Sequence, residues 1–358
     1  MKLAQALVNQ HGARVLIPPH AAREGFWFGA GNLVAGPDGA WYLVGRYRDE
    51  GDSRAGLGKG ARGLELALFR STDQGASFSR VLSFAKQDLA AGEREVVSIE
   101  GAKLRFHEGG VELYVSTEKS GIGYPPGLES YLKPGTGVWT IDLLEAPSVA
   151  ELKGRRPRTI IEASDPRWLH AKDPVVFDAA SGDTLLYFCT HPFNWSSSNA
   201  ALAVRPRGAQ AFSAPDFGFF PRGYAWDVAI TRISGLCRVP AAGTRIPAGA
   251  SLVFYDGGES IRPLQEHAAA VRRPRGYSCE ELGGVALMVE PRYDEVQRLS
   301  VALPAFVSPY GTGCSRYVSV LETGEGYVAT WQQSQPDLSR PLVANFLSRA
   351  EAEQVLRA

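Results

Sequence analysis

Residues 32–49 read NLVAGPDGAWYLVGRYRD, and residues 64–71, which follow a polar loop, read LELALFRS. The first stretch contains two short hydrophobic runs separated by Pro37-Asp38-Gly39, residues that accept the φ values of a tight hairpin. Short apolar runs between turn residues are typical of β-strands. The two stretches together therefore predict three antiparallel strands in succession, which is a β-meander.

The same sequence pattern, a hairpin followed by a polar loop and a third strand, recurs four more times along the chain. The later copies begin near residues 100, 173, 227 and 315. Repetition of one β-meander indicates a propeller, because every blade of a propeller is built in the same way. We therefore predict an all-β fold in which residues 1–358 form a single five-bladed β-propeller, with blades that start near 32, 100, 173, 227 and 315.

The two ends of the chain are expected to complete this ring. Residues 14–18 are predicted to supply the outer strand of the last blade. The segment after Ser348 predicts a short C-terminal helix, because Ser348 and Glu351 have the spacing of a capping box. Two other folds stay open: a two-sheet sandwich with an added domain, and a six-bladed propeller in which the regions near residues 14 and 304 count separately.

Composition excludes several classes of function. The chain has 38 basic and 38 acidic residues, so no net charge attracts it to nucleic acid or to an anionic membrane. It contains neither a signal-peptide core nor a membrane-spanning segment, so we expect a soluble, cytoplasmic protein. The four cysteines lie far apart, which suggests neither a zinc site nor a disulfide framework. We expect no cofactor and no metal, although a cation in the central channel stays open.

Propeller topology sorts the loops onto two faces. If each innermost strand starts at one end of the axis, its hairpin turn lies at the other end, and the loop after the second strand returns to the first end. The short Gly-rich turns then form a plain face, and the long charged and aromatic loops form an active face. Aromatic rings beside polar groups suit a small carbohydrate. The predicted substrate-binding residues are Arg46, Arg48, Asp49, Trp168, His170, His191, Trp195, Trp226 and Tyr277.

Acidic residues stand at the predicted starts of three innermost strands, where they converge on the axis. Cleavage of a glycosidic bond takes one carboxylic acid that protonates the leaving oxygen and one carboxylate that activates water or attacks directly. We assign Glu100 or Glu281 as the general acid and Asp227 as the base. Asp173 is assigned as a carboxylate that tunes the pKa of a catalytic group or orients it. The alternative is that these acids cap turns or bind water and cations in the channel.

Short motifs resemble those of known propeller enzymes. Residues 98–104, SIEGAKL, and residues 172–177, KDPVVF, are similar to strand-start motifs of the five-bladed glycosidase superfamily, which includes arabinanases, invertases and mannoside phosphorylases. Residues 71–78, STDQGASF, resemble the Asp-box of sialidases and lie between the third and fourth strands, where a structural role is expected. The resemblance implies a glycoside hydrolase. The chain departs from it at Asn32, where arabinanase-like enzymes place a catalytic Asp.

Arginine clusters leave the substrate and the reaction open. Arg46 and Arg48 suit a clamp on a carboxylate or phosphate, and residues 272–281 place further arginines beside Tyr277 and Glu281, as in sialidases. An acidic sugar of the uronic or sialic type is therefore expected. A phosphorylase is an alternative, as is a uronic-acid lyase that removes a proton with His170, His191 or Tyr277. A non-catalytic propeller that only binds carbohydrate is a further alternative.

Overall fold

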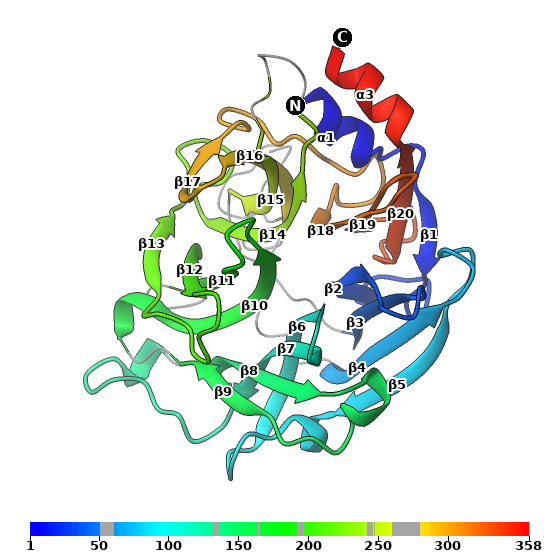
Figure 1. Cartoon of the computed structure of the whole chain (residues 1–358). Coiled ribbons are helices and arrows are strands. Elements are labelled where there is room, and N and C mark those ends of the chain that lie inside the picture. Colours follow the sequence, from blue (N-terminus) through cyan, green and yellow to red (C-terminus); the bar gives the residue numbers. More distant parts are fainter. Residues whose placement is uncertain are drawn as a thin grey trace.

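The computed structural model describes residues 1–50, 61–131, 136–162, 165–191, 197–241, 246, 248–259 and 280–357. Five four-stranded sheets surround a central axis (Figure 1), which confirms the predicted five-bladed β-propeller. The strands of four blades pair in chain order, so the pattern repeated in the sequence corresponds to the meander of one blade. In this part of the chain the arrangement is neither a sandwich nor a six-bladed ring.

Each blade is an antiparallel sheet. Blade one consists of β2 (Trp27–Ala35), β3 (Trp41–Asp49), β4 (Ala61–Ser71) and β5 (Ser79–Ala85). Blade two consists of β6 (Val96–His107), β7 (Gly110–Lys119), β8 (Val138–Ala146) and β9 (Arg158–Ile161). Blade three consists of β10 (Leu169–Asp178), β11 (Thr184–His191), β12 (Asn199–Arg205) and β13 (Asp216–Phe220).

The remaining two blades complete the ring. Blade four consists of β14 (Ile230–Arg238), β15 (Ala250–Gly258), β16 (Leu282–Val289) and β17 (Arg292–Arg298). Blade five consists of β18 (Ser315–Glu322), β19 (Gly326–Gln333), β20 (Leu342–Ser348) and β1 (Arg14–Ile17), which comes from the other end of the chain. Short 3-10 helices lie at Lys86–Leu89, Glu129–Tyr131, Val149–Glu151 and Pro166–Trp168.

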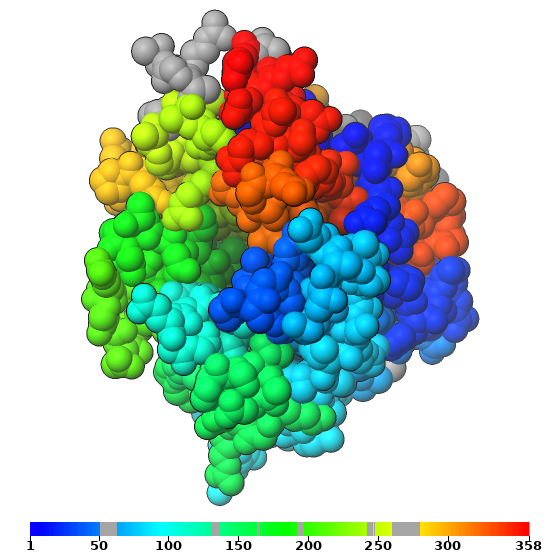
Figure 2. Space-filling model, turned by 45° about the vertical axis from the view of Figure 1, so that its right-hand side comes forward, coloured from blue at the N-terminus to red at the C-terminus, as the bar shows by residue number. Residues whose placement is uncertain are grey.

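The two ends of the chain meet at blade five. Strand β1 pairs antiparallel with β20. Helices α1 (Lys2–Leu7) and α3 (Arg349–Arg357) lie side by side (Figure 1), and Leu3, Leu7 and Ala352 belong to the same buried cluster. On the surface, C-terminal residues (red) lie beside N-terminal residues (blue) in Figure 2. Helix α3 begins with the predicted capping box, in which Ser348 Oγ donates to Glu351 Oε2 at 2.6 Å and accepts from the Glu351 N–H at 3.2 Å.

Apolar side chains fill the space between neighbouring blades. Five of the buried clusters in the described part of the chain each join two adjacent sheets. Between blades one and two, for example, Val44 and Leu68 pack with Leu104 and Val115. Face-to-face packing of this kind removes apolar surface from water, which is the main favourable term in folding. The core is therefore distributed around the ring, and polar side chains are left for the axis.

The innermost strands β2, β6, β10, β14 and β18 all have an irregular register. Four residues at these bulges, Ala30, His170, Asp173 and Tyr317, adopt positive φ values of 59°, 63°, 52° and 58°. A bulge places an extra residue in the strand and turns its side chain. Positive φ in residues other than glycine is strained and often marks a functional site. The bulges therefore decide which side chains gather at the axis.

Lys103 links three innermost strands across the axis. It belongs to β6, and its Nζ donates to the carbonyl oxygen of Gly31 on β2 at 2.6 Å and to that of Ser234 on β14 at 3.0 Å. Burial lowers the pKa of Lys103 to about 8, although the negative charges of Asp256 and Asp173 oppose the shift. A buried ammonium group thus joins the blades beside the acids of the axis.

Replacing Lys103 with methionine is predicted to change how stability depends on pH. The unfolded chain holds this proton up to about pH 10.5 and the folded protein up to about pH 8, so loss of the proton stabilises the wild-type fold between these values. From pH 7 to pH 9.5, the free energy of unfolding of the wild type, measured with urea, should rise by about 2 kcal/mol relative to that of Lys103→Met. A difference in stability that stays constant over this range would contradict the burial of a charged lysine.

Candidate active site

A buried arginine on β14 contacts three carboxylates. Nη1 of Arg232 lies 3.3 Å from Asp173 Oδ2 and 3.1 Å from Glu281 Oε1, and its Nη2 lies 2.8 Å from Asp256 Oδ2. Asp173 belongs to β10, Asp256 to β15, and Glu281 directly precedes β16. Arg232, Asp173 and Asp256 are each at most 4% exposed. Acids from blades three and four are therefore held by one guanidinium group.

The separation of Asp173 and Glu281 suits two-carboxylate chemistry. Because both oxygens contact the same nitrogen of Arg232, they lie at most about 6.4 Å apart, which is compatible with the carboxyl separations found in glycosidases. Asp173 is fixed by two further hydrogen bonds. Its Oδ1 accepts from the Gly101 N–H at 3.2 Å, and its own N–H donates to Ser116 Oγ at 3.1 Å. Its carboxylate is therefore positioned from blades two and four.

Glu100 reaches the same group from blade two. Its Oε2 is ion-paired with Arg46 on β3 and lies 3.7 Å from Lys172 Nζ on β10. Gly101, the next residue, donates to Asp173, so Glu100 and Asp173 stand on contacting strands. The structure thus brings together three of the four residues predicted to be catalytic: Glu100, Asp173 and Glu281.

Glu281 lies between two arginines. It pairs with Arg232 of blade four and with Arg316 of β18 in blade five. Burial by itself raises the pKa of the Glu281 carboxyl, but the charges of Arg232 and Arg316 outweigh burial and hold the pKa well below its ordinary value. Glu281 is therefore ionised at neutral pH. This suits a base or a nucleophile better than the general acid that we considered from the sequence.

The placement predicted for Asp227 and Trp226 is wrong. Asp227 lies before β14 and is turned toward the outer strands, where its Oδ2 is 2.9 Å from Arg298 Nε and accepts from Tyr255 Oη at 3.2 Å. Trp226 is 2% exposed and stacks on Tyr255 with ring centroids 5.6 Å apart. Burial raises the pKa of Asp227. The partly exposed Arg298 on β17 pairs with this acid, and the indole packs in the core between blades three and four.

Two predicted binding residues near the active face are engaged in local contacts. Asp49 is 2.9 Å from Nδ1 of His20. Trp168 stacks on Phe217 of β13 with ring centroids 5.4 Å apart and an angle of 7° between the planes. These partners hold both side chains away from the group around Arg232. Arg48 is 7% exposed and stands opposite Trp27 in the register of blade one.

The two predicted histidines form a buried cluster of their own. His170 Nε2 lies 2.5 Å from Tyr124 Oη, and the rings of His170 and His191 are 5.9 Å apart. Nδ1 of His191 is 2.8 Å from the carbonyl oxygen of Ser197. Burial is the main cause that moves the pKa of His191 well below its ordinary value. The predicted binding residues Trp195 and Tyr277 lie outside the described residues.

Several central residues were missed in the sequence, although a signal for them exists. Arg232, Asp256, Arg316 and Lys103 are charged residues at buried positions within strands, and Gln332 is a polar residue in a similar position. A strand buried on both faces cannot leave such a side chain in water. The partner of each one must therefore be found within the protein.

Asn32 of β2 joins blade one to blade two. Its Nδ2 donates to the Leu104 carbonyl oxygen at 2.9 Å, and its Oδ1 accepts from the Leu104 N–H at 2.9 Å. The side-chain amide of Asn32 therefore adds two hydrogen bonds between the innermost strands β2 and β6. This pair of bonds requires a donor and an acceptor on one side chain, which a carboxylate does not offer.

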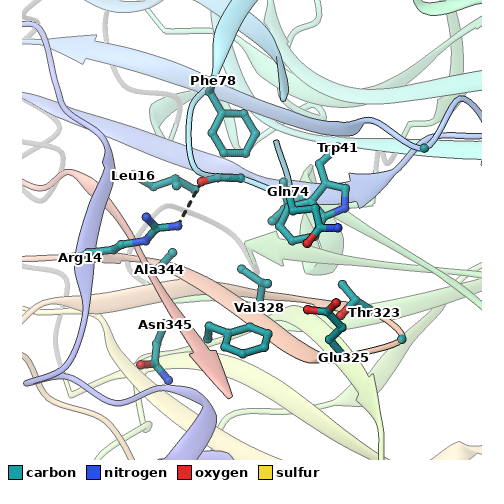
Figure 3. A pocket seen from close by; sticks show the side chains of 15 residues that line it. Arg14, Leu16, Trp41, Gln74, Phe78, Thr323, Glu325, Val328, Ala344 and Asn345 are labelled. Carbon is teal, nitrogen blue, oxygen red and sulfur yellow. Dashed lines mark hydrogen bonds between the residues drawn. The ribbon is translucent and has the colours of Figure 1, made fainter. Parts of the chain in front are cut away.

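A pocket lies on the plain face, at the seam between blades five and one (Figure 3). This pocket of about 470 Å³ is lined by turn residues together with Trp41 and Phe78, and Arg14 donates across it to the Gly75 carbonyl oxygen at 3.1 Å. Among the described residues that line it, Glu325 alone is acidic. The pocket therefore lacks the two carboxyl groups that hydrolysis of a glycosidic bond requires.

The turn between β4 and β5 has the hydrogen bonds of a structural motif. Asp73 accepts from the Ser77 N–H at 2.9 Å and from the Ser77 hydroxyl at 2.5 Å, and Ser71 Oγ accepts from the Gly75 N–H at 2.8 Å. The Ser77 hydroxyl is the main cause that lowers the pKa of Asp73 to about 2. Asp73 thus holds a turn that lies away from the Arg232 group.

No group of three or more His, Cys, Asp or Glu side chains is placed to hold a metal ion in the described part of the chain. Within the same residues, no helix is long and apolar enough to cross a membrane.

Known proteins resemble the chain in structure and not in sequence. No family model and no curated protein sequence matches it. An α-L-arabinofuranosidase from Lactobacillus brevis aligns over 94% of this chain and 93% of its own, with a TM-score of 0.57 and 11% identity. An endo-arabinase from Bacteroides thetaiotaomicron covers 93% and 97%, with a TM-score of 0.54 and 12% identity. A thermostable family-43 glycoside hydrolase covers 91% and 88%, with a TM-score of 0.55 and 11% identity. The likeness is one of fold.

Replacing Asn32 with alanine is predicted to destabilise the protein. Two backbone groups of Leu104 lose their partners, and leaving such groups unpaired is costly. We expect the free energy of unfolding to fall by about 2 kcal/mol, measured by urea denaturation. Asn32→Asp should lose stability as well, because it keeps the acceptor and loses the donor. An aspartate variant as stable as the wild type would contradict the structural role of this amide.

Proposed function

We propose that this protein is a glycoside hydrolase that cleaves its substrate with carboxyl groups at the propeller axis. The observation that supports the proposal best is that Asp173 and Glu281, from neighbouring blades, share the Nη1 atom of Arg232. Glycosidases cleave the glycosidic bond with carboxyl groups that lie close together, and Asp173 and Glu281 are such a pair of neighbouring acids. The proteins of similar fold are named as an arabinofuranosidase, an endo-arabinase and a glycoside hydrolase, which agrees with the proposal.

The charges of the site support a division of roles. Glu281, held ionised by Arg232 and Arg316, is proposed as the base that activates water or as the nucleophile. Glu100 is then the proton donor, and a substrate group that takes over the guanidinium of Arg46 frees it for that role. Asp173, which is held by the Gly101 N–H and by Arg232, is proposed to orient the other two acids.

The cations at the axis favour an acidic sugar of the uronic or sialic type. Among the described residues there, five cations accompany four carboxylates: Arg46, Lys103, Lys172, Arg232 and Arg316 against Glu100, Asp173, Asp256 and Glu281. A negatively charged substrate group reduces this excess of positive charge, which is larger when Glu100 carries the proton that it donates.

Charge-removing substitutions at the axis are predicted to abolish hydrolysis. We expect Asp173→Asn and Glu281→Gln each to lower kcat/KM at least about 100-fold on aryl glycosides and oligosaccharides, because each removes a carboxylate of the reaction. Asp227→Asn is the matched control and should stay within about threefold of the wild type, since Asp227 lies away from the axis.

The substrate panel includes neutral, uronic and sialic glycosides, each with and without phosphate. Product formation that persists in both axis variants would overturn the site assignment. A requirement for phosphate would identify a phosphorylase, and an unsaturated product would identify a lyase. Binding without turnover of any glycoside would support a non-catalytic propeller.

A further inference from the structure

Three buried side chains where blade five meets blade one carry donors that have no acceptor in the described part of the protein. The donor atoms are Nε and Nη1 of Arg46, Nη2 of Arg316 and Nε2 of Gln332. The three residues are 2%, 4% and 0% exposed. A buried donor without a partner is costly, and a charged one more so. The feature therefore indicates a ligand that offers acceptor oxygens.

The donors of blade five stand together. Arg316 and Gln332 are opposite each other in the register of β18 and β19, and Arg316 Nε donates to Gln332 Oε1 at 2.7 Å. The guanidinium is a planar fork, so this bond holds the side-chain amide of Gln332 against its edge. Gln332 also lies against Gly29, where a Cβ would come within 2.9 Å of Nε2. A side chain at position 29 would therefore occupy the place of the amide.

Arg46 lies near this pair through the ring of Trp27. The guanidinium carbon of Arg46 is 4.3 Å from the centroid of the indole, and that of Arg316 is 5.1 Å from it. Arg46 also pairs with Glu100, and Arg316 pairs with Glu281. Three of the four unpaired donors therefore belong to the two arginines that hold the proposed proton donor and the proposed base.

We infer that Arg316 and Gln332, assisted by Arg46, form an oxyanion subsite that receives the carboxylate of an acidic sugar. The inference rests on the proposed function and names the group by which the substrate is selected. A carboxylate offers acceptors without donors, which matches an arrangement of donors. Bound there, the carboxylate lies next to the arginines that hold Glu100 and Glu281. Free phosphate carries the same oxyanion chemistry and is the other source to be tested.

The test uses Gln332→Glu. The new carboxylate keeps an acceptor for Arg316 Nε, so the fold should be retained, while a negative charge replaces the amide nitrogen. Isothermal titration of the full-length protein with D-glucuronate, D-glucose and inorganic phosphate measures binding without turnover. We expect the wild type to bind glucuronate about tenfold or more tightly than glucose, and Gln332→Glu to lose that preference. Gln74→Glu, which adds the same charge at an exposed turn of the plain face, should bind as the wild type does.

Each outcome decides the inference. Equal affinity for glucuronate and glucose, or a Gln332→Glu variant with undiminished preference, overturns it. If phosphate binds more tightly than glucuronate, and Gln332→Glu loses phosphate binding, the subsite is one for free phosphate. That result overturns the assignment to a sugar carboxylate. If the protein hydrolyses neutral glycosides and shows no preference for anions, the proposed hydrolase function is supported and the oxyanion subsite is contradicted. If the protein binds glucuronate selectively but hydrolyses no glycoside, the oxyanion subsite is supported and the proposed hydrolase function is contradicted.

Discussion

Arg232 is buried at the axis, with its guanidinium shared among Asp173, Asp256 and Glu281. Removing a guanidinium and three carboxylates from water is costly, and the cost is offset only when every charge has a well-placed partner. Burial opposes the charged form of Arg232, yet the surrounding carboxylates, Glu281 first among them, raise its pKa well above the ordinary value. One cation therefore contacts all three carboxylates, and each of them has a further partner.

From this centre, polar contacts extend to every blade. Glu281 continues to Arg316 of blade five, and Asp173 accepts from Gly101 of blade two. Glu100, beside Gly101, pairs with Arg46 of blade one. The inter-blade cores are apolar and similar around the ring, whereas the axis is polar and different in each blade. The fold thus supplies a rigid ring, and the bulges of the innermost strands turn the functional side chains toward one another.

The sequence allowed much of the architecture to be predicted, because a repeated β-meander leaves a local pattern of short apolar runs and Gly-rich turns. The same pattern identified Glu100 and Asp173, which stand at bulges of innermost strands. It failed for Asp227, because Arg298 on the outermost strand of the same blade pairs with it, and a local pattern does not reveal such a partner. Arg232 and Arg316 escaped notice because a lone arginine in a strand has meaning only once its buried partners are known.

The most direct test of the axis as the functional centre is a crystal structure of the protein with an acidic monosaccharide, D-glucuronate, bound. The predicted result is a sugar at the axis, in contact with Asp173 or Glu281, with its carboxylate on Arg316 and Gln332. A sugar bound in the plain-face pocket beside Trp41 and Phe78, with none at the axis, would contradict the central claim.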